Sequence, residues 1–141
     1  AGTLTGISGS TDLIKVGLVR KIVSRGISIG EIGVTGKARI IKNNLDMSLI
    51  CPGEILFVPK ELMKNIPLSK NIAGIVTNQN VNDVYALFNK NNKKISTICN
   101  LENMDNHQIS NGDLITLQLN EGVIYMGQIE DDDATDKYKY V

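Results

Sequence analysis

The chain has 141 residues, of which 42% are apolar and 21% are charged, an ordinary balance for one globular domain. Fifteen basic and fifteen acidic residues cancel to a formal net charge of zero. Because cationic contacts with phosphates supply most of the affinity of nucleic-acid binders, this balance argues against a nucleic-acid partner. No run reaches the roughly 20 consecutive apolar residues of a membrane helix, which argues against a membrane partner.

The chain opens with Ala1-Gly2-Thr3 and shows no signal-peptide pattern, so we expect it to be a piece of a longer protein. Asn, Ile and Lys are frequent, as in residues 89–94, a bias typical of AT-rich genomes such as those of apicomplexans. The sequence leaves two cellular locations open for the protein, the cytoplasm and a plastid-like organelle.

Short runs rich in Ile and Val, divided by glycine and proline, predict strands. The predicted strands cover Leu13–Val23, Thr35–Ile41, Glu54–Val58, Ala73–Thr77, Ile95–Cys99, Leu114–Leu119 and Val123–Met126. The last two flank Asn120-Glu121-Gly122, which predicts a hairpin with Gly122 at positive φ.

Two helices fit between these strands. The first covers Lys60–Ile66 and ends before Pro67, whose ring would clash with a continuing helix. The second lies near Val81–Lys90, where one apolar stripe at helical spacing predicts packing of Val81, Val84, Tyr85 and Phe88. Strands and helices in this order predict an α/β fold with more strand than helix.

The start of the second helix has clear capping signals. Asn80 is a good N-cap, and Asp83 three residues later imitates a capping box. The Asp83 carboxylate also suits the positive end of the helix dipole.

A phosphate-binding loop is the first chemical motif to test, because glycines recur before a Gly-Lys pair. A Walker loop needs a glycine five residues before that pair and Ser or Thr after it. Around Gly36-Lys37 those positions hold Glu31 and Ala38, and a strand follows where the motif needs a helix. We therefore interpret the glycines as turn residues: Gly26, Gly30, Gly33 and Gly36.

Other reactive side chains are sparse. Cys51 and Cys99 both lie in apolar runs, so we expect two small buried side chains and no disulfide. His107 is the single histidine and lies in a polar stretch, so neither a catalytic triad nor a metal site is predicted. The carboxylates show no distinctive spacing for acid/base work, among them Glu54, Glu61 and Asp83.

Over residues Gly26–Gly127 the chain resembles the mobile, swivelling phosphohistidine domain of the phosphoenolpyruvate-utilising enzymes. The matching pieces are 35–39 (Thr-Gly-Lys-Ala-Arg), 52–56 (Pro-Gly-Glu-Ile-Leu), 73–77 (Ala-Gly-Ile-Val-Thr) and Asp113–Gly127, with its Gly-Val-Ile-Tyr-Met-Gly ending. The resemblance implies a swivelling β/β/α fold.

The preceding residues Gly6–Val16 look like the end of a pyruvate kinase C-terminal domain, a glycine loop followed by its last strand. In allosteric pyruvate kinases that loop helps to bind a sugar bisphosphate. The resemblance thus implies an effector-loop remnant at Gly6, Ser8, Gly9, Ser10 and Thr11.

Together the two stretches resemble the extra C-terminal domain of a pyruvate kinase. Residues 1–25 would be the last strand of the domain before it and a linker, residues 26–128 the swivelling domain, and residues 129–141 an acidic flexible tail. The implied parent transfers phosphate between phosphoenolpyruvate and ADP with Mg²⁺ and K⁺, as a homotetramer. Its catalytic residues are not in this chain, and no cofactor is expected here. A strand that has lost its neighbours also makes edge pairing between two copies an open hypothesis.

The chain departs from the family where phosphate would be carried. Active carriers have a Gly-Gly-x-Thr-Ser/Cys-His-Ala turn at the helix start. Here Asn80 and Val81 replace the glycines, Asp83 and Val84 the Thr and Ser/Cys, and Tyr85 the histidine. A phenol, with an ordinary pKa of about 10, is almost wholly protonated near pH 7, whereas an imidazole is a nucleophile there.

We therefore expect a non-catalytic domain that stabilises or regulates its parent. Two alternatives stay open. One is a phosphocarrier that uses a relocated residue such as His107. The other is a module that binds an anion at a remnant site at the helix start, formed by Asn80, Val81 and Asn82.

Overall fold

A computed structural model describes residues 21–105 and 108–127. The described residues from Ile22 onward form a compact unit, and its eight strands make one sheet, in the order β1-β8-β7-β3-β4-β5-β6-β2. The elements are β1 (Ile22–Arg25), β2 (Ile27–Ile29), β3 (Val34–Ile40), the 3₁₀ helix η1 (Asn44–Leu49), β4 (Glu54–Val58), the 3₁₀ helix η2 (Lys60–Asn65), β5 (Ile72–Thr77), α1 (Val81–Lys90), β6 (Thr97–Cys99), β7 (Leu114–Gln118) and β8 (Val123–Met126). The predicted α/β, strand-rich fold is confirmed.

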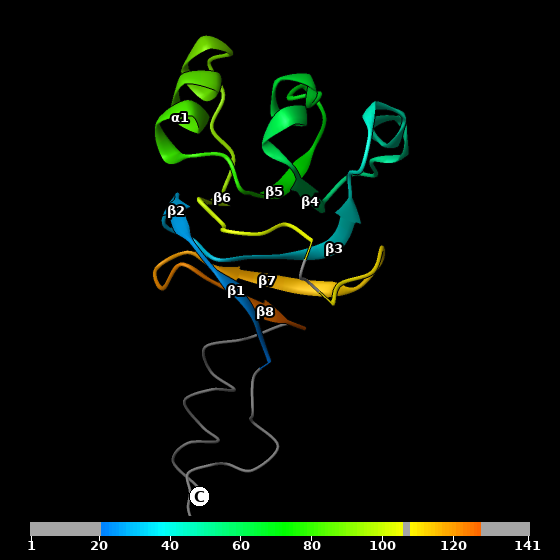
Figure 1. Ribbon diagram of the computed structural model, residues 1–141, viewed down its shortest axis with the longest axis vertical. Coiled ribbons are helices and arrows are strands. Elements are labelled where there is room, and N and C mark those ends of the chain that lie inside the picture. The colour runs from blue at the N-terminus through cyan, green and yellow to red at the C-terminus, as the bar shows by residue number, and fades with distance from the viewer. Residues whose placement is uncertain (1–20, 106–107, 128–141) are drawn as a thin grey trace, which may run out of the picture. The chain divides into compact units, whose positions relative to one another are not determined.

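Strand β3 connects a parallel half of the sheet to an antiparallel half. Its residues 34–37 pair antiparallel with β7, and residues 38–40 pair parallel with β4. β4, β5 and β6 continue in parallel, with β2 antiparallel to β6 at the edge, whereas β7, β8 and β1 pair antiparallel. Figure 1 shows α1, η1 and η2 on one side of the parallel strands, with β7 and β8 on the other.

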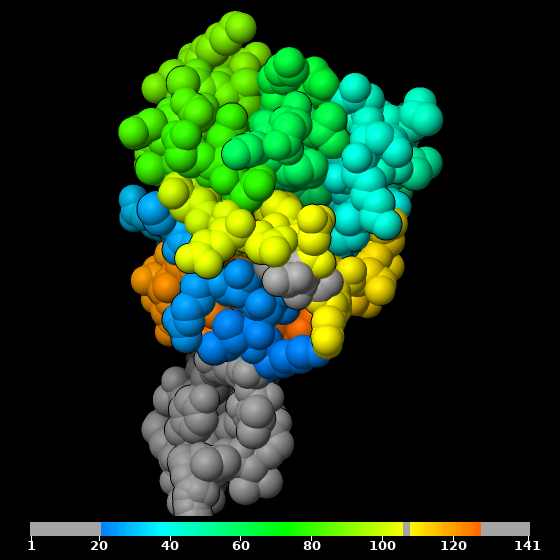
Figure 2. All heavy atoms as spheres, viewed as in Figure 1, coloured from blue at the N-terminus to red at the C-terminus, as the bar shows by residue number. Residues whose placement is uncertain are grey.

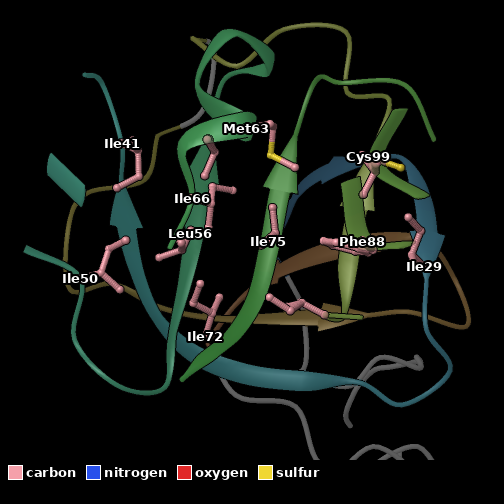
Figure 3. Close-up of a cluster of buried hydrophobic side chains, with 13 residues drawn as sticks. Ile29, Ile41, Ile50, Leu56, Met63, Ile66, Ile72, Ile75, Phe88 and Cys99 are labelled. Atoms are coloured by element: carbon pink, nitrogen blue, oxygen red, sulfur yellow. The ribbon is translucent and has the colours of Figure 1, made fainter. Parts of the chain in front are cut away.

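Two apolar cores cover the two faces of the parallel strands. Alternate side chains of β4 separate between them, because successive residues of a strand point to opposite faces. Leu56 and Val58 pack under the helices together with Phe88 of α1, as Figure 3 shows for Leu56 and Phe88. Ile55 and Phe57 pack against the antiparallel half. All five β4 residues are buried, which explains why this strand was predictable from its composition.

The sequence predicted most element positions. The bounds of β4, α1 and β8 are as expected, and Gly122 has a φ of 67° in the β7–β8 hairpin. The Lys60–Ile66 segment is a 3₁₀ helix, and β2 and η1 were not expected. Of the predicted strand Leu13–Val23, residues 13–20 lie outside the described part of the chain, and β1 begins at Ile22.

The Gly36-Lys37 pair lies inside β3, opposite Ile115 and Leu114 of β7, so the interpretation of Gly36 as a turn residue was wrong. A Cβ atom on Gly36 would lie 2.6 Å from the carbonyl oxygen of Gly53, so glycine permits a close approach of the backbone before β4. The pair is therefore part of the sheet framework.

Candidate functional site

The carboxyl ends of β4, β5 and β6 meet at one edge of the parallel half-sheet. In open α/β sheets, ligands bind outside this edge. The turn after β5, residues 78–80, leads there into α1. Asn78 ties the turn to the neighbouring strand end, because its Oδ1 accepts a hydrogen bond from the Lys60 N–H at 2.7 Å.

Asn80 is the N-cap of α1, as the sequence predicted. Its Oδ1 accepts a hydrogen bond from the Asp83 N–H at 2.9 Å, and its Nδ2 donates to Asp83 Oδ2 at 2.9 Å. The carboxylate therefore accepts the side-chain amide of Asn80, where a full capping box would use the backbone N–H. This pair fixes a negative charge beside the first turn of the helix.

Asn100, directly after β6, closes the same turn from the other side. Its Oδ1 accepts a hydrogen bond from the Val81 N–H at 2.8 Å, and its own N–H donates to the Gln79 carbonyl at 2.8 Å. Asn100 has a φ of 63°, in the left-handed region that Asn tolerates better than most residues. Figure 2 shows the segment after β6, in yellow, crossing this face between the helices in green and β1 in blue.

These hydrogen bonds bear on the anion hypothesis for Asn80, Val81 and Asn82. A helix start binds anions through backbone N–H groups that have no partner within the helix. Here the chain itself supplies acceptors for Val81 and Asp83. Since the Asp83 carboxylate lies among them, an anion would have to displace side chains that already serve the helix start.

Tyr85 does not pack as predicted. It is 41% exposed, whereas Val84 is fully buried and Phe88 is 2% exposed. The buried stripe is completed by Leu87, which packs against the core beneath α1 together with Val81. The sequence prediction placed Tyr85, four residues after Val81, in the core. The buried stripe of α1 is instead centred nearer Val84, three residues after Val81.

The exposed positions around the turn carry little reactivity. The residue aligned with the carrier histidine is a solvent-exposed phenol, and the residue before it is a buried valine. Asp83 and Tyr85 are two residues apart on α1 and are both exposed. In the described residues this face presents amides, a carboxylate and a phenol, and no thiol or imidazole.

The two cysteines differ from each other. Cys99 is buried, as predicted, and its Sγ donates to the Ile27 carbonyl at 3.3 Å. Burial raises its pKa to about 11. Cys51 is exposed, so the prediction of a second buried thiol was wrong. It lies at the turn before β4, beyond the apolar end of its run, where Pro52 and Gly53 redirect the chain.

An ion pair that the sequence did not predict joins β3 to the start of β4. Arg39 of β3 donates from Nε to Glu54 Oε1 at 3.1 Å and from its terminal nitrogen to Oε2 at 2.9 Å. Glu54 Oε1 also accepts the Cys51 N–H at 2.7 Å. Burial by itself raises the pKa of Glu54, but the hydrogen bonds from Arg39 and Cys51 outweigh it and leave the pKa below its usual value.

Several candidate residues lie outside the described part of the chain. They are His107, the acidic run 130–133, and the effector-loop candidates Gly6, Ser8, Gly9, Ser10 and Thr11. Among residues 21–105 and 108–127, no group of three or more His, Cys, Asp or Glu side chains could hold a metal ion. None of the helices described there combines the length and apolar character needed to span a bilayer.

Comparison with known proteins finds pyruvate kinases. The chain is 33% identical over 129 residues to pyruvate kinase 2 of Synechocystis sp., covering 92% of this chain and 22% of that protein. It is 29% identical over 129 residues to the pyruvate kinase of Staphylococcus saprophyticus, covering 90% of this chain and 22% of that protein. The chain thus spans about a fifth of the length of these relatives.

No protein-family model matches the chain. Among solved structures, the microcin C7 self-immunity protein MccF bound to glutamyl sulfamoyl guanosine aligns with a TM-score of 0.42 and 12% identity, over 78% of this chain and 41% of that one. A likeness this weak carries no argument. Over nine-tenths of its length, then, the chain is homologous to one part of the pyruvate kinases, as a domain of such an enzyme would be.

Proposed function

We propose that the chain is the non-catalytic, swivelling-type domain appended to the C-terminus of a pyruvate kinase, and that it stabilises or regulates its parent. Residues 26–128 are the appended domain, residues 1–25 the last strand of the preceding domain and a linker, and residues 129–141 an acidic tail. Support comes from similarity to about a fifth of each pyruvate kinase and from a layered, strand-rich fold with helices on one side.

The observation that carries the non-catalytic part is the turn between β5 and α1. An exposed tyrosine stands where a carrier would need histidine, and Asn80 and Asn100 cap the helix start. Phosphoryl transfer depends on positioning and on positive charge at the phosphoryl oxygens. The Asp83 carboxylate at this turn works against both.

The proposed parent transfers phosphate between phosphoenolpyruvate and ADP, and its Mg²⁺ and K⁺ would bind outside this chain. The proposed parent is a homotetramer, so the domain would have neighbouring subunits to contact. Helix η1 presents two large apolar side chains, Leu45 at 80% exposure and Leu49 at 54%. Two such side chains on one short helix suit contact with the rest of the parent.

Deleting residues 26–141 from the parent tests the proposal. We expect kcat at saturating substrates to stay within about twofold, because no catalytic group is removed. The thermal midpoint should fall by several degrees, and tetramer dissociation or the response to phosphorylated effectors should change. A coupled assay measures kcat, and calorimetry measures the thermal midpoint. Sedimentation measures tetramer dissociation, and activation curves measure the response to effectors.

A parent unchanged in stability, assembly and effector response would contradict the proposal. A double substitution, Leu45→Asp with Leu49→Asp, provides a milder version of the same test. It should reproduce the change in assembly while leaving the folding of this domain intact, since both side chains are exposed. Glu61→Gln on η2, which is also exposed, is the matched control and should leave assembly unchanged.

A further inference from the structure

A polar hollow lies at the opposite edge of the parallel half-sheet, where β5 and β6 begin. It has a volume of about 300 Å³. We call it the lysine pocket, and its lining residues are Lys70, Asn71, Ile72, Ala73, Lys93, Lys94, Ile95 and Ser96. None of them belongs to the turn between β5 and α1, so the lysine pocket is separate from the candidate site above.

The backbone brings the pocket lysines together from two distant segments. β5 and β6 run in parallel, so the residues preceding each strand meet at one edge, and the Ile75 N–H donates to the Ser96 carbonyl at 2.9 Å. After α1 the chain reverses through Asn92, which has a φ of 51°. The Lys93 N–H then donates back to the Phe88 carbonyl at 3.0 Å, which fixes the direction in which Lys93 and Lys94 leave the helix.

Every polar side chain of the lysine pocket can donate a hydrogen bond, and none is a carboxylate. The ion pair found between described residues is Arg39–Glu54, so the pocket lysines are not neutralised by a described acid. Lys70 Nζ makes one long contact, donating to the Met47 carbonyl at 3.4 Å. Three lysines thus line one hollow in a chain whose formal net charge is zero.

The floor beneath these charges is apolar and buried. Ile72 is 9% exposed and Ile95 is 5% exposed, and both belong to the core beneath α1. A volume of about 300 Å³ is at the lower end of the range of small-molecule sites. Lysine is a common phosphate ligand that acts as a point charge on a flexible stem.

We infer that the lysine pocket binds the phosphate group of a small phosphorylated molecule. Three lysines would surround the phosphate oxygens, Asn71 and Ser96 would donate further hydrogen bonds, and Ala73 would leave space beside the strand. This inference is independent of the proposed function, since it rests on the lining of the pocket alone.

Titration of the full 141-residue chain with inorganic phosphate and with pyrophosphate tests it, followed by ¹H–¹⁵N correlation spectra at constant ionic strength. We expect saturable shifts at the amides of Ile72, Ala73, Ile95 and Ser96, with tighter binding of pyrophosphate because it carries more charge. The double substitution Lys93→Ala with Lys94→Ala should weaken binding by about tenfold or more, as expected for the loss of charge-assisted hydrogen bonds.

Lys60→Ala with Lys64→Ala is the matched control. It removes the same charge from exposed positions on η2, and binding should stay within about twofold. Shifts that do not saturate, or that respond equally to both double substitutions, would show general ion screening and overturn the inference.

A third variant separates a small ligand from the chain's own acidic run. Replacing Glu130, Asp131, Asp132 and Asp133 by the corresponding amides should leave the phosphate affinity unchanged. Loss of saturable binding in this variant would show that the lysine pocket does not bind phosphate by itself, and would also overturn the inference.

Discussion

The side-chain oxygen of Asn100 accepts a hydrogen bond from the backbone N–H of Val81 at 2.8 Å, and so joins the end of β6 to the first residue of α1. The two residues are 19 apart in sequence. This contact satisfies one of the N–H groups that an α-helix leaves unpaired at its start. It also takes up a position that an anion would need.

Substituting Asn100 separates the hydrogen bond from the backbone conformation. Asn100→Gly loses the side-chain acceptor, but glycine adopts a φ of 63° without strain. We therefore expect destabilisation of about 1 kcal/mol. Asn100→Ala loses the same acceptor and adds left-handed strain, for a total of about 2 kcal/mol. Urea unfolding measures both, and equal stabilities for wild type and Asn100→Gly would show that the contact contributes nothing.

The Arg39–Glu54 pair predicts a pH dependence of stability. The pKa of Glu54 is lowered from its ordinary value of 4.5, so the folded protein holds the charged form more strongly than the unfolded chain does. The contribution is therefore complete above about pH 4.5 and is lost as the pH falls through the lower folded pKa. In Glu54→Gln the stability at pH 7 should fall by about 2 kcal/mol, because Arg39 loses its charged partner.

That variant should also lose part of the acid dependence below about pH 4.5. Unfolding by urea at a series of pH values measures this difference. Glu61→Gln, at an exposed position, should change stability at pH 7 by less than about 0.5 kcal/mol. Identical acid profiles for wild type and Glu54→Gln would contradict the assignment.

Gly122 and Gly112 form a second matched pair. Both have positive φ, at 67° and 91°. A Cβ on Gly122 would lie 2.5 Å from the Gly26 carbonyl oxygen, whereas one on Gly112 would meet nothing within 4 Å. We expect Gly112→Ala to cost about 1–2 kcal/mol from backbone strain and Gly122→Ala to cost clearly more. Thermal unfolding that ranks the two in the opposite order would refute the close approach at the hairpin.

The two thiols should react at very different rates. Cys51 is exposed, while Cys99 is buried and its pKa of about 11 leaves only about 0.1% thiolate at pH 8. In the folded chain a disulfide reagent should modify one thiol rapidly, and in urea it should modify two. Cys51→Ser should abolish the rapid phase. A rapid phase that survives this substitution would show that Cys99 is accessible.

The sequence was informative wherever local patterns decide the structure. β4 is a run of five buried residues, and α1 begins at a good N-cap, so both were predicted with their bounds. β2 was missed because three residues between glycines are too few to show alternation, and its position depends on antiparallel pairing with distant β6. The prediction that Cys51 is buried failed because its apolar run ends one residue earlier, at Ile50.

The site needed long-range information. The departure from the carrier motif was visible in the sequence at Tyr85, but its exposure depends on which edge of the α1 stripe faces the sheet. The Arg39–Glu54 contact joins the parallel neighbours β3 and β4, and the Val81–Asn100 contact joins the start of α1 to the end of β6. No periodicity within one segment reveals such contacts, because they depend on strand order and register.

Phosphoryl labelling tests the central claim, that no phosphoryl group passes through this chain. The chain is incubated with ³²P-labelled phosphoenolpyruvate and the catalytic part of its parent, and label is measured before and after acid treatment. We predict no incorporation above that of a Tyr85→Phe control. Stoichiometric acid-labile label would indicate phosphohistidine, and acid-stable label that disappears in Tyr85→Phe would indicate phosphotyrosine. Either result would contradict a non-catalytic domain.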